Sequence, residues 1–181
     1  MNFVFYLQPQ GKTVRGRALD CGAGIGRITK HLLTRICTRV DMVELNQSFL
    51  NKAKASYLGK VSEKVENYFC SGLQEFTPEK GAYDLIWCQW VMGQLKDDDL
   101  VAFFKRCQEG LAENGLIVLK ENTKSKIKSA EPDYDEDDSS YCRSRDHFVS
   151  LIEKSGLTIV KEATATRFPR EIYEVRSYAC Q

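Results

Sequence analysis

The sequence predicts a single α/β domain, with a mainly parallel sheet and helices on both of its faces. The first observation is that strand and helix candidates alternate along most of the 181 residues. The second is that the strand candidates are continuous apolar runs, which is typical of strands covered on both faces. The third is that no internal repeat marks a second domain. A chain of this length can bury a sizeable core.

The first half of the chain contains four strand candidates and two helix candidates. The strand candidates share short runs of apolar, β-branched and aromatic side chains, at residues 17–21, 40–45, 65–70 and 83–90. Apolar residues from Ile25 to Ile36 recur at helical spacing. Residues 46–58 predict a second helix with Asn46 as its N-cap. We expect a loop at residues 71–81.

The second half begins with the clearest helix of the chain. It has an acidic opening, an Asn-Gly stop and apolar residues at i, i+3, i+4, i+7 and i+11, namely Leu100, Phe103, Phe104, Cys107 and Leu111. A polar stretch at residues 123–140 interrupts the pattern, and a last helix is expected around residues 146–154. The three remaining strand candidates are residues 116–122, 157–163 and 171–179.

Composition excludes several classes of protein. The chain has 26 basic and 25 acidic side chains, so it lacks the strongly basic character typical of proteins that bind nucleic acid directly. The apolar run from Phe3 to Leu7 is too short for a membrane span or a signal sequence. We therefore expect an intracellular, soluble protein that binds neither nucleic acid nor a membrane.

The seven cysteines predict neither disulfides nor a metal site. They are spread along the chain without a Cys-x-x-Cys pair, and they do not combine with His31 or His147 at a usual zinc spacing. Their apolar neighbours favour reduced thiols in or near the core. Each histidine is interpreted as a surface or structural residue.

Three glycines after the first strand, in "ALDCGAGIGR", predict a ligand site. Gly22, Gly24 and Gly26 precede the first helix, where ligands bind in a parallel α/β sheet. A dinucleotide fingerprint needs a G-x-G-x-x-G spacing, but here the third glycine comes one residue early and Arg27 takes the place of the last glycine. A phosphate-binding P-loop is excluded because no Gly-Lys-Ser/Thr follows.

The remaining common occupant is S-adenosyl-L-methionine, which carries no phosphate. Glu44 ends the second strand at the distance where an acid accepts hydrogen bonds from ribose hydroxyls. Asp20 could serve the methionine ammonium, directly or through water, and would repel a phosphate. The alternative is a purely structural glycine turn.

Six segments together resemble the protein α-N-terminal methyltransferase family: "LDCGAGIGRITKHLL", "NYFCSGLQEFTP", "YDLIWCQWV", "GLIVLKEN", "DSSYCR" and "EIYEV". The resemblance implies a Rossmann-like, seven-stranded S-adenosylmethionine-dependent methyltransferase fold over residues 18–181. Residues 1–17 are expected to be a short extension that does not match, as in an N-terminally shortened member. The implied activity is methylation of the free α-amine of proteins that begin X-Pro-Lys or similar, in the nucleus and cytoplasm.

The resemblance also implies residue roles. Six residues would bind the cofactor: Gly22, Arg27, Glu44, Leu73, Gln74 and Gln89. Four would bind the peptide substrate: Trp90, Asn122, Ser140 and Tyr173. Asp138 and Gln94 would act on the reacting amine, although Gln94 stands where the family normally carries a histidine. A glutamine can hydrogen-bond the amine but cannot take up its proton near pH 7.

The chemistry of an α-amine explains the need for an acid. Its pKa of about 7.7–8.0, against about 10.4 for lysine, leaves a sizeable neutral fraction at pH 7. Only modest help from a general base is then required, and Asp138 could orient the ammonium and accept its proton.

Other interpretations of these residues remain open. The acidic run that includes Asp133, Asp135, Glu136 and Asp137 could be a solvated loop or could attract a basic substrate tail. The Trp90 side chain could belong to the core, and Tyr173 could be an ordinary strand aromatic. Two alternative functions also remain: a methyltransferase with another acceptor, and a weakly active or inactive cofactor-binding scaffold. The number of methyl groups added, the preferred first residue and the oligomeric state are not predicted.

Overall fold

In the computed structural model, the residues described are 15–124, 132–165 and 173–181. The expectations for the N-terminal run Phe3–Leu7 lie outside these residues. Nine strands of the described chain form one sheet: β1 (Arg15–Cys21), β2 (Cys37–Glu44), β3 (Val65–Cys70), β4 (Tyr83–Gln89), β5 (Leu111–Lys124), β6 (Asp133–Asp135), β7 (Ser140–Ser144), β8 (Ile159–Thr164) and β9 (Glu174–Cys180).

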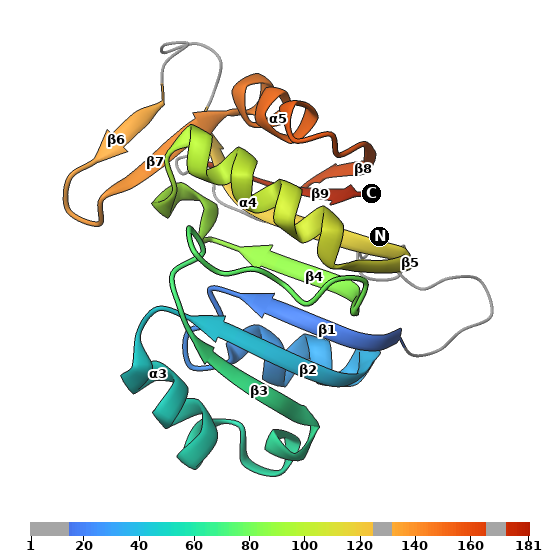
Figure 1. Ribbon diagram of the computed structural model, residues 1–181. Coiled ribbons are helices and arrows are strands. Elements are labelled where there is room, and N and C mark those ends of the chain that lie inside the picture. Colours follow the sequence, from blue (N-terminus) through green and yellow to red (C-terminus); the bar gives the residue numbers. More distant parts are fainter. Residues whose placement is uncertain (1–14, 125–131, 166–172) are drawn as a thin grey trace.

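The strand order is that of a doubly wound sheet. β3, β2, β1, β4 and β5 lie side by side in this order, and their neighbours run parallel. β9 then pairs antiparallel with β5, and β8 pairs antiparallel with β9 (Figure 1). The chain moves outward from β1 to β3 and then crosses to β4 on the other side of β1. The carboxyl ends of β1 and β4 therefore form the switch point at which such sheets bind ligands.

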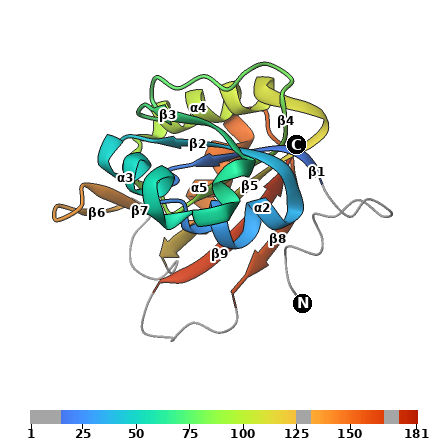
Figure 2. The same cartoon turned by 90° about the horizontal axis from the view of Figure 1, so that it is seen from below.

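Helices cover both faces of the sheet. They are the π-helical turn η1 (Thr29–Leu33) with α2 (Thr34–Ile36), α3 (Gln47–Lys52) with the π-helical turn η2 (Ala53–Tyr57), the 3-10 helices η3 (Gly59–Lys64) and η4 (Met92–Gln94), α4 (Asp97–Gly110) and α5 (Arg145–Lys154). Figure 2 shows α4 on one side of β1 and β2 and α2 on the other.

The core divides into layers because alternate side chains of each strand face opposite sides. Leu19 and Cys21 of β1 pack in the cluster that contains the aromatic residues of α4 and α5. Ala18 packs on the other side, in the cluster that contains Leu33. The rings of Phe104 in α4 and Phe148 in α5 meet edge to face with centroids 6.3 Å apart, so these two helices share one apolar layer.

All seven predicted strands are confirmed, as are the helices. Asn46 caps α3 as expected, because its side chain accepts a hydrogen bond from the Ser48 backbone N–H at 2.9 Å. The helix predicted over Leu100–Leu111 ends one residue early, and Leu111 instead begins the long strand β5. Five cysteines are buried, as expected of thiols in the core, whereas Cys142 is half-buried and Cys70 is exposed.

The sequence did not predict the β6–β7 hairpin. Residues 123–140 were expected to be a polar stretch, but Asp133–Asp135 pairs antiparallel with Ser140–Cys142. Two register pairs, Thr123 with Arg143 and Lys124 with Ser144, join β7 to β5. The hairpin therefore extends beyond the carboxyl edge of the sheet (Figure 1). In the part of the chain that the structure describes, no helix is long and apolar enough to cross a membrane.

Candidate active site

Two adjoining cavities lie at the carboxyl edge of the sheet. The first, here called the glycine groove, has a volume of about 380 Å³ and is lined by Gly22, Val43, Glu44, Leu45, Ser71, Gly72, Leu73, Gln74, Trp90, Val91, Gln94 and Leu95. Most of these residues lie at or just after the carboxyl ends of β1, β2, β3 and β4. The volume lies in the range typical of small-molecule sites.

Gly22 shapes the floor of the glycine groove. Its φ of +69° is in the left-handed region that favours glycine. A Cβ at this position would lie 2.5 Å from Cγ2 of Val91, which lines the same groove. The backbone can therefore approach a ligand and the Val91 side chain only because residue 22 is glycine. The space beside Gly22, which any side chain would fill, is the kind of close backbone approach expected for the adenosine-containing cofactor.

Glu44 ties the glycine loop to the end of β2. Its Oε2 accepts a hydrogen bond from the Gly24 backbone N–H, and its Oε1 accepts one from the Asn46 backbone N–H, both at 2.9 Å. A carboxylate has about four acceptor positions, so both oxygens retain capacity for a ligand hydroxyl. Glu44 therefore has the position and the acceptor capacity expected of a ribose-binding acid.

Leu73 and Gln74 line the glycine groove on the side of the loop that follows β3. Arg106 of α4 holds this loop, because its Nη2 donates to the carbonyl oxygens of Leu73 and Gln74 at 2.8 Å and its Nε donates to that of Phe76 at 2.9 Å. The sequence analysis missed Arg106. The sequence carries no signal for it, since it lies 30 to 33 residues from its partners on an otherwise ordinary helix.

Three residues expected near the cofactor do not line the groove. Gln89 is buried, and its Oε1 accepts a hydrogen bond from Trp87 Nε1 at 3.3 Å. Asp20 accepts hydrogen bonds from the backbone N–H and the hydroxyl of Thr29, at 3.0 and 2.6 Å. Burial raises the pKa of Asp20 to about 6. Arg27 is exposed, with its guanidinium 5.4 Å from the centre of the Trp90 ring.

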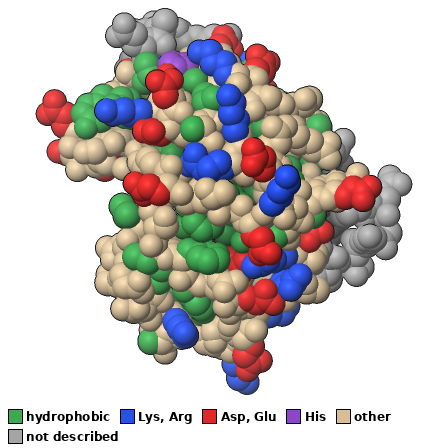
Figure 3. All heavy atoms as spheres, in the orientation of Figure 1, with side chains coloured by type: hydrophobic (Ala, Val, Ile, Leu, Met, Phe, Trp, Pro, Cys, Tyr) green, Lys and Arg blue, Asp and Glu red, His purple; other side chains and the backbone are tan. Residues whose placement is uncertain are grey.

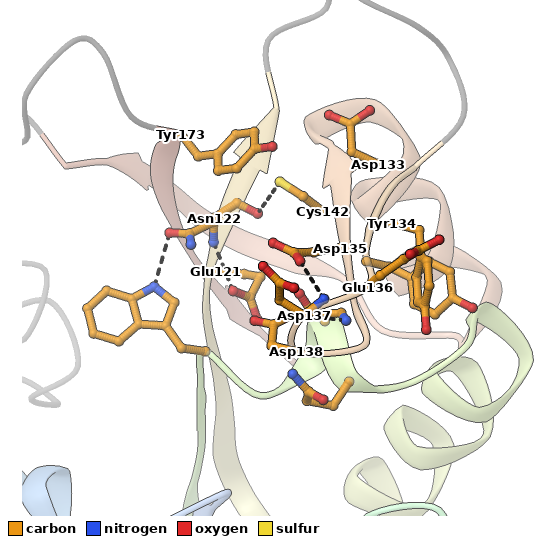
Figure 4. Close-up of a pocket in the computed structure, with 15 residues that line it drawn as sticks. Glu121, Asn122, Asp133, Tyr134, Asp135, Glu136, Asp137, Asp138, Cys142 and Tyr173 are labelled. Carbon is orange, nitrogen blue, oxygen red and sulfur yellow. Dashed lines mark hydrogen bonds between the residues drawn. The ribbon is translucent and has the colours of Figure 1, made fainter.

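The second cavity, here called the acidic pocket, has a volume of about 490 Å³ (Figure 4). Six of its lining residues are acidic: Glu121, Asp133, Asp135, Glu136, Asp137 and Asp138. The others are Trp90, Gly93, Gln94, Asn122, Tyr134, Ser140, Tyr141, Cys142 and Tyr173. All four residues expected to bind substrate and both expected to act on the amine therefore meet in one cavity.

Trp90 stands between the two cavities. It is 41% exposed, and its φ of +55° is unusual for a bulky residue. The strained backbone is held by a hydrogen bond from its N–H to the Lys120 carbonyl oxygen at 3.0 Å. The Lys120 ammonium also lies 5.2 Å from the centre of its ring. The interpretation of Trp90 as a core residue was therefore wrong, because its indole is at the surface of both cavities.

Asn122 and Glu121 come from the carboxyl end of β5. Asn122 Oδ1 accepts a hydrogen bond from Trp90 Nε1 at 3.2 Å, which fixes the orientation of both side chains. Glu121 was not predicted as a site residue. Its carboxylate accepts from the backbone N–H groups of Asn122 and Met92 at 3.0 and 3.2 Å, and burial raises its pKa.

The hairpin forms the acidic wall of the pocket. Asp138 is exposed, and its Oδ1 accepts a hydrogen bond from the Ser140 backbone N–H at 3.0 Å, which closes the turn between β6 and β7. Lys124 pairs with Asp133 at 3.0 Å. Figure 4 shows the Asp135, Asp137 and Asp138 side chains coming from the hairpin, and Figure 3 shows acidic side chains at the edge where the hairpin lies.

Tyr173 precedes β9 and lies on the same side of the pocket as Asn122 (Figure 4). It is 46% exposed, and partial burial together with the nearby Cys142, Asp133 and Asp135 raises its pKa. The phenol therefore stays protonated near neutral pH and can donate a hydrogen bond. The interpretation of Tyr173 as an ordinary strand aromatic is not supported, because it lies outside β9.

Across the described residues, no three His, Cys, Asp or Glu side chains are grouped so that they could hold a metal ion. His31 does not line either cavity, and its ring meets Tyr57 edge to face at 6.5 Å. His147 contacts Asp97 Oδ2 through Nε2 at 2.7 Å. Both histidines are thus structural or surface residues, as expected.

The doubly wound sheet, the glycine groove at its switch point and the adjoining acceptor pocket together define an S-adenosylmethionine-dependent methyltransferase. A family model described as "AdoMet dependent proline di-methyltransferase" matches residues 2–181. The chain belongs to this family. The match includes residues 2–17, for which the sequence motifs carried no resemblance.

Curated relatives agree with this assignment. "N-terminal Xaa-Pro-Lys N-methyltransferase 1" of Danio rerio is 50% identical over 175 residues, which are 97% of this chain and 76% of that protein. The protein of the same name from Mus musculus is 46% identical with the same coverage.

Solved structures agree as well. A SAM-dependent methyltransferase of Leishmania major has a TM-score of 0.85 and 37% identity, over 98% of this chain and 68% of that one. A methyltransferase of Mesorhizobium loti has a TM-score of 0.75 at 14% identity, over 98% of this chain and 95% of that one, which supports the fold alone.

Proposed function

We propose that this protein methylates the free α-amine of proteins that begin Xaa-Pro-Lys, with S-adenosyl-L-methionine as the methyl donor. The observation that carries the proposal is that the two cavities adjoin: Trp90 and Gln94 line both the glycine groove and the acidic pocket. An acceptor amine in the acidic pocket would then lie next to the bound cofactor. The names of the curated relatives support this acceptor.

The acidic pocket suits a cationic peptide end. An Xaa-Pro-Lys terminus carries an α-ammonium and a lysine ammonium, and the hairpin presents Asp135, Glu136, Asp137 and Asp138 to it. Only Asp133 of this run is paired with a lysine in the structure described. The surplus negative charge favours a basic segment over a neutral or acidic one.

The residues of the acidic pocket have different roles in the proposed reaction. The cofactor, when bound, would supply an electrophilic methyl group on a sulfonium, whose sulfur would be the leaving group. Asp138 accepts a proton from the α-ammonium, so that the nitrogen lone pair is free to form the new bond. Gln94 hydrogen-bonds the amine without taking up its proton. Trp90, Asn122 and Tyr173 bound the space for the residues that follow the amine.

A second candidate function follows from Gln94. Because this glutamine stands where the family resemblance calls for a histidine, the protein could bind cofactor and peptide without efficient transfer. The nuclear and cytoplasmic residence suggested by the family is part of the proposal and is tested by imaging the tagged full chain.

Mass spectrometry of a Ser-Pro-Lys peptide incubated with the protein and S-adenosylmethionine tests the proposal. We expect methyl masses on the free peptide and none on the same peptide N-acetylated. D138N should lower kcat/KM about tenfold to a hundredfold, because general-base and charge contributions are lost together. D98N removes one exposed carboxylate outside both cavities and should leave activity unchanged.

The outcomes separate the two functions. Methylation of both peptides would contradict the α-amine proposal and favour another acceptor. Folded protein that binds S-adenosylhomocysteine and peptide but transfers no methyl group would support the scaffold.

A further inference from the structure

The segment 92–95, here called the wall turn, separates the two cavities and contains η4. Gly93 and Gln94 face the acidic pocket, and Gln94 and Leu95 face the glycine groove. Its local backbone hydrogen bonds are few: Gln94 N–H donates to the carbonyl oxygen of the preceding Val91 at 3.1 Å, and Leu95 N–H donates to that of Met92 at 3.3 Å. A turn this short needs support from outside to hold one conformation.

Arg143 of β7 supplies that support on the carbonyl side. Its side chain is 2% exposed, and it donates from Nη1 to the Met92 carbonyl oxygen at 3.1 Å and from Nη2 to the Leu95 carbonyl oxygen at 2.5 Å. Its Nε donates to Asp97 Oδ1 at 2.8 Å. A buried guanidinium with its donors committed to three fixed acceptors holds those acceptors in one geometry.

Glu121 of β5 supports the same turn on the amide side. Its Oε2 accepts from the Met92 N–H at 3.2 Å, and its Oε1 accepts from the Asn122 N–H at 3.0 Å. Met92 is therefore held through its N–H by the half-buried carboxylate of Glu121 and through its carbonyl oxygen by the buried guanidinium of Arg143. The two charges also compensate each other across the turn, which lessens the cost of burying either one.

The orientation of Arg143 is itself fixed. Asp97, the first residue of α4, accepts from Arg143 through Oδ1 and contacts His147 Nε2 through Oδ2 at 2.7 Å. His147 belongs to α5, whose first residue lies two positions after Arg143. The network thus joins the wall turn to β7, the strand that carries Ser140.

The wall turn also packs directly on the hairpin. A Cβ on Gly93 would lie 3.3 Å from the Tyr141 carbonyl oxygen and 3.5 Å from the Ser140 Cβ. A displacement of β7 would therefore move Gln94, and a displacement of the wall turn would move the acidic wall.

We propose that Arg143, opposed by Glu121, is a positioning residue that holds the wall turn and the hairpin in register, so that Gln94 and the acidic wall face one acceptor amine. This deepens the proposed function and rests on it for the identity of the acceptor. Peptide binding depends on both elements that Arg143 joins. Gln94 and Leu95 of the wall turn also line the glycine groove, but most of the groove is formed by residues outside this turn, such as Gly22, Glu44 and Leu73. We therefore expect a smaller effect of Arg143 on cofactor binding than on peptide binding.

The test uses R143M and R143K in the full chain, with R17M as the matched control. Arg17 is a partly buried arginine that pairs with the fully buried Asp41 at 2.7 Å, on the strand β1 but outside both cavities. Hydrogen exchange is measured over residues 91–95. Calorimetry measures the Kd of S-adenosylhomocysteine, and then the Kd of a Ser-Pro-Lys peptide with that cofactor product bound. All measurements are made well below the lowest Tm.

We expect R143M to accelerate amide exchange in residues 91–95 at least tenfold and to weaken peptide binding at least tenfold, with the S-adenosylhomocysteine Kd within about threefold of wild type. R143K should recover part of the loss, because one ammonium cannot reach all three acceptors. R17M should lower Tm without changing either Kd or the exchange of residues 91–95.

Unchanged exchange in folded R143M would overturn the proposal, as would equal losses of peptide and cofactor affinity in R143M and R17M. Failure of the wild-type protein to bind the peptide would refute the proposed acceptor instead. The exchange measurement would still decide whether Arg143 holds the wall turn.

Discussion

Trp90 Nε1 donates a hydrogen bond to Asn122 Oδ1 at 3.2 Å, which joins the carboxyl ends of β4 and β5. The bond fixes an exposed aromatic ring whose own backbone is in a left-handed conformation. The ring lines both cavities, so its orientation affects the shape of each.

Removal of the Asn122 amide should therefore weaken peptide recognition. We expect N122A to raise the peptide KM about tenfold, because a lost hydrogen bond costs about 1–2 kcal/mol and the indole becomes free to rotate. Steady-state kinetics with the Ser-Pro-Lys peptide measures this change. N51A, on the exposed side of α3, is the control. An unchanged KM would show that the bond is incidental to the acceptor site.

Gly22 should be required for cofactor binding. In G22A the new Cβ would lie 2.5 Å from Val91 Cγ2, so the groove must distort. We expect the S-adenosylhomocysteine Kd to rise at least tenfold in calorimetry. G59A is the matched control, because Gly59 has a similar φ of +60° and a Cβ there would meet no atom within 4 Å. Equal effects of both variants on the Kd would assign the loss to general backbone strain.

Arg106 should support the glycine groove by holding the loop after β3. R106M leaves the carbonyl oxygens of Leu73, Gln74 and Phe76 without their present donor, so the loop after β3 gains freedom. We expect a lower Tm and a three- to tenfold weaker S-adenosylhomocysteine Kd. K105M changes the exposed neighbouring residue of α4 and should preserve both quantities. A weakened Kd in K105M as well would point to α4 as a whole.

Asp20 should make stability depend on pH. Burial raises its folded-state pKa from an ordinary value near 3.8 to about 6, so the folded protein binds this proton more tightly than the unfolded chain. The contribution of Asp20 to stability is therefore largest below pH 4 and declines as pH rises to about 6. The decline has an upper bound of about 3 kcal/mol.

D20N removes the group that titrates, so its protonation no longer contributes to the free energy of unfolding. The asparagine oxygen can still accept a hydrogen bond from Thr29. We expect the free energy of unfolding of D20N, relative to wild type, to increase between pH 4 and pH 6 and to level off above. Urea unfolding across this range measures it. A difference that is constant with pH would contradict the raised pKa.

The sequence was a good guide where local pattern decides structure. The continuous apolar runs at β1, β4 and β5 and the apolar periodicity of α4 predicted the layers of the fold. The hairpin was missed because Asp133 and Asp135 are residue types depleted in strands. Its pairing depends on the partner strand, which a local pattern does not reveal.

The site was predicted unevenly for a related reason. The motif residues Trp90, Asn122 and Asp138 do meet in one pocket. Glu121 and Arg143 were missed because their importance arises from partners tens of residues away. Gln89 does not line the glycine groove, and its Oε1 accepts a hydrogen bond from Trp87 in the same strand, so its role toward the cofactor stays a prediction.

The attachment of the hairpin has an evolutionary consequence. Among the described residues, β7 meets β5 at two register pairs, and most of the acidic wall lies on residues 133–140. The glycine groove is built instead at the carboxyl ends of β1 to β4. Substitutions in one short hairpin could thus retune which amine-bearing ends are accepted without disturbing the methyl-donor half. Acceptor recognition and methyl-donor binding are thus carried by separate elements, which Arg143 of β7 joins through its hydrogen bonds to Met92 and Leu95.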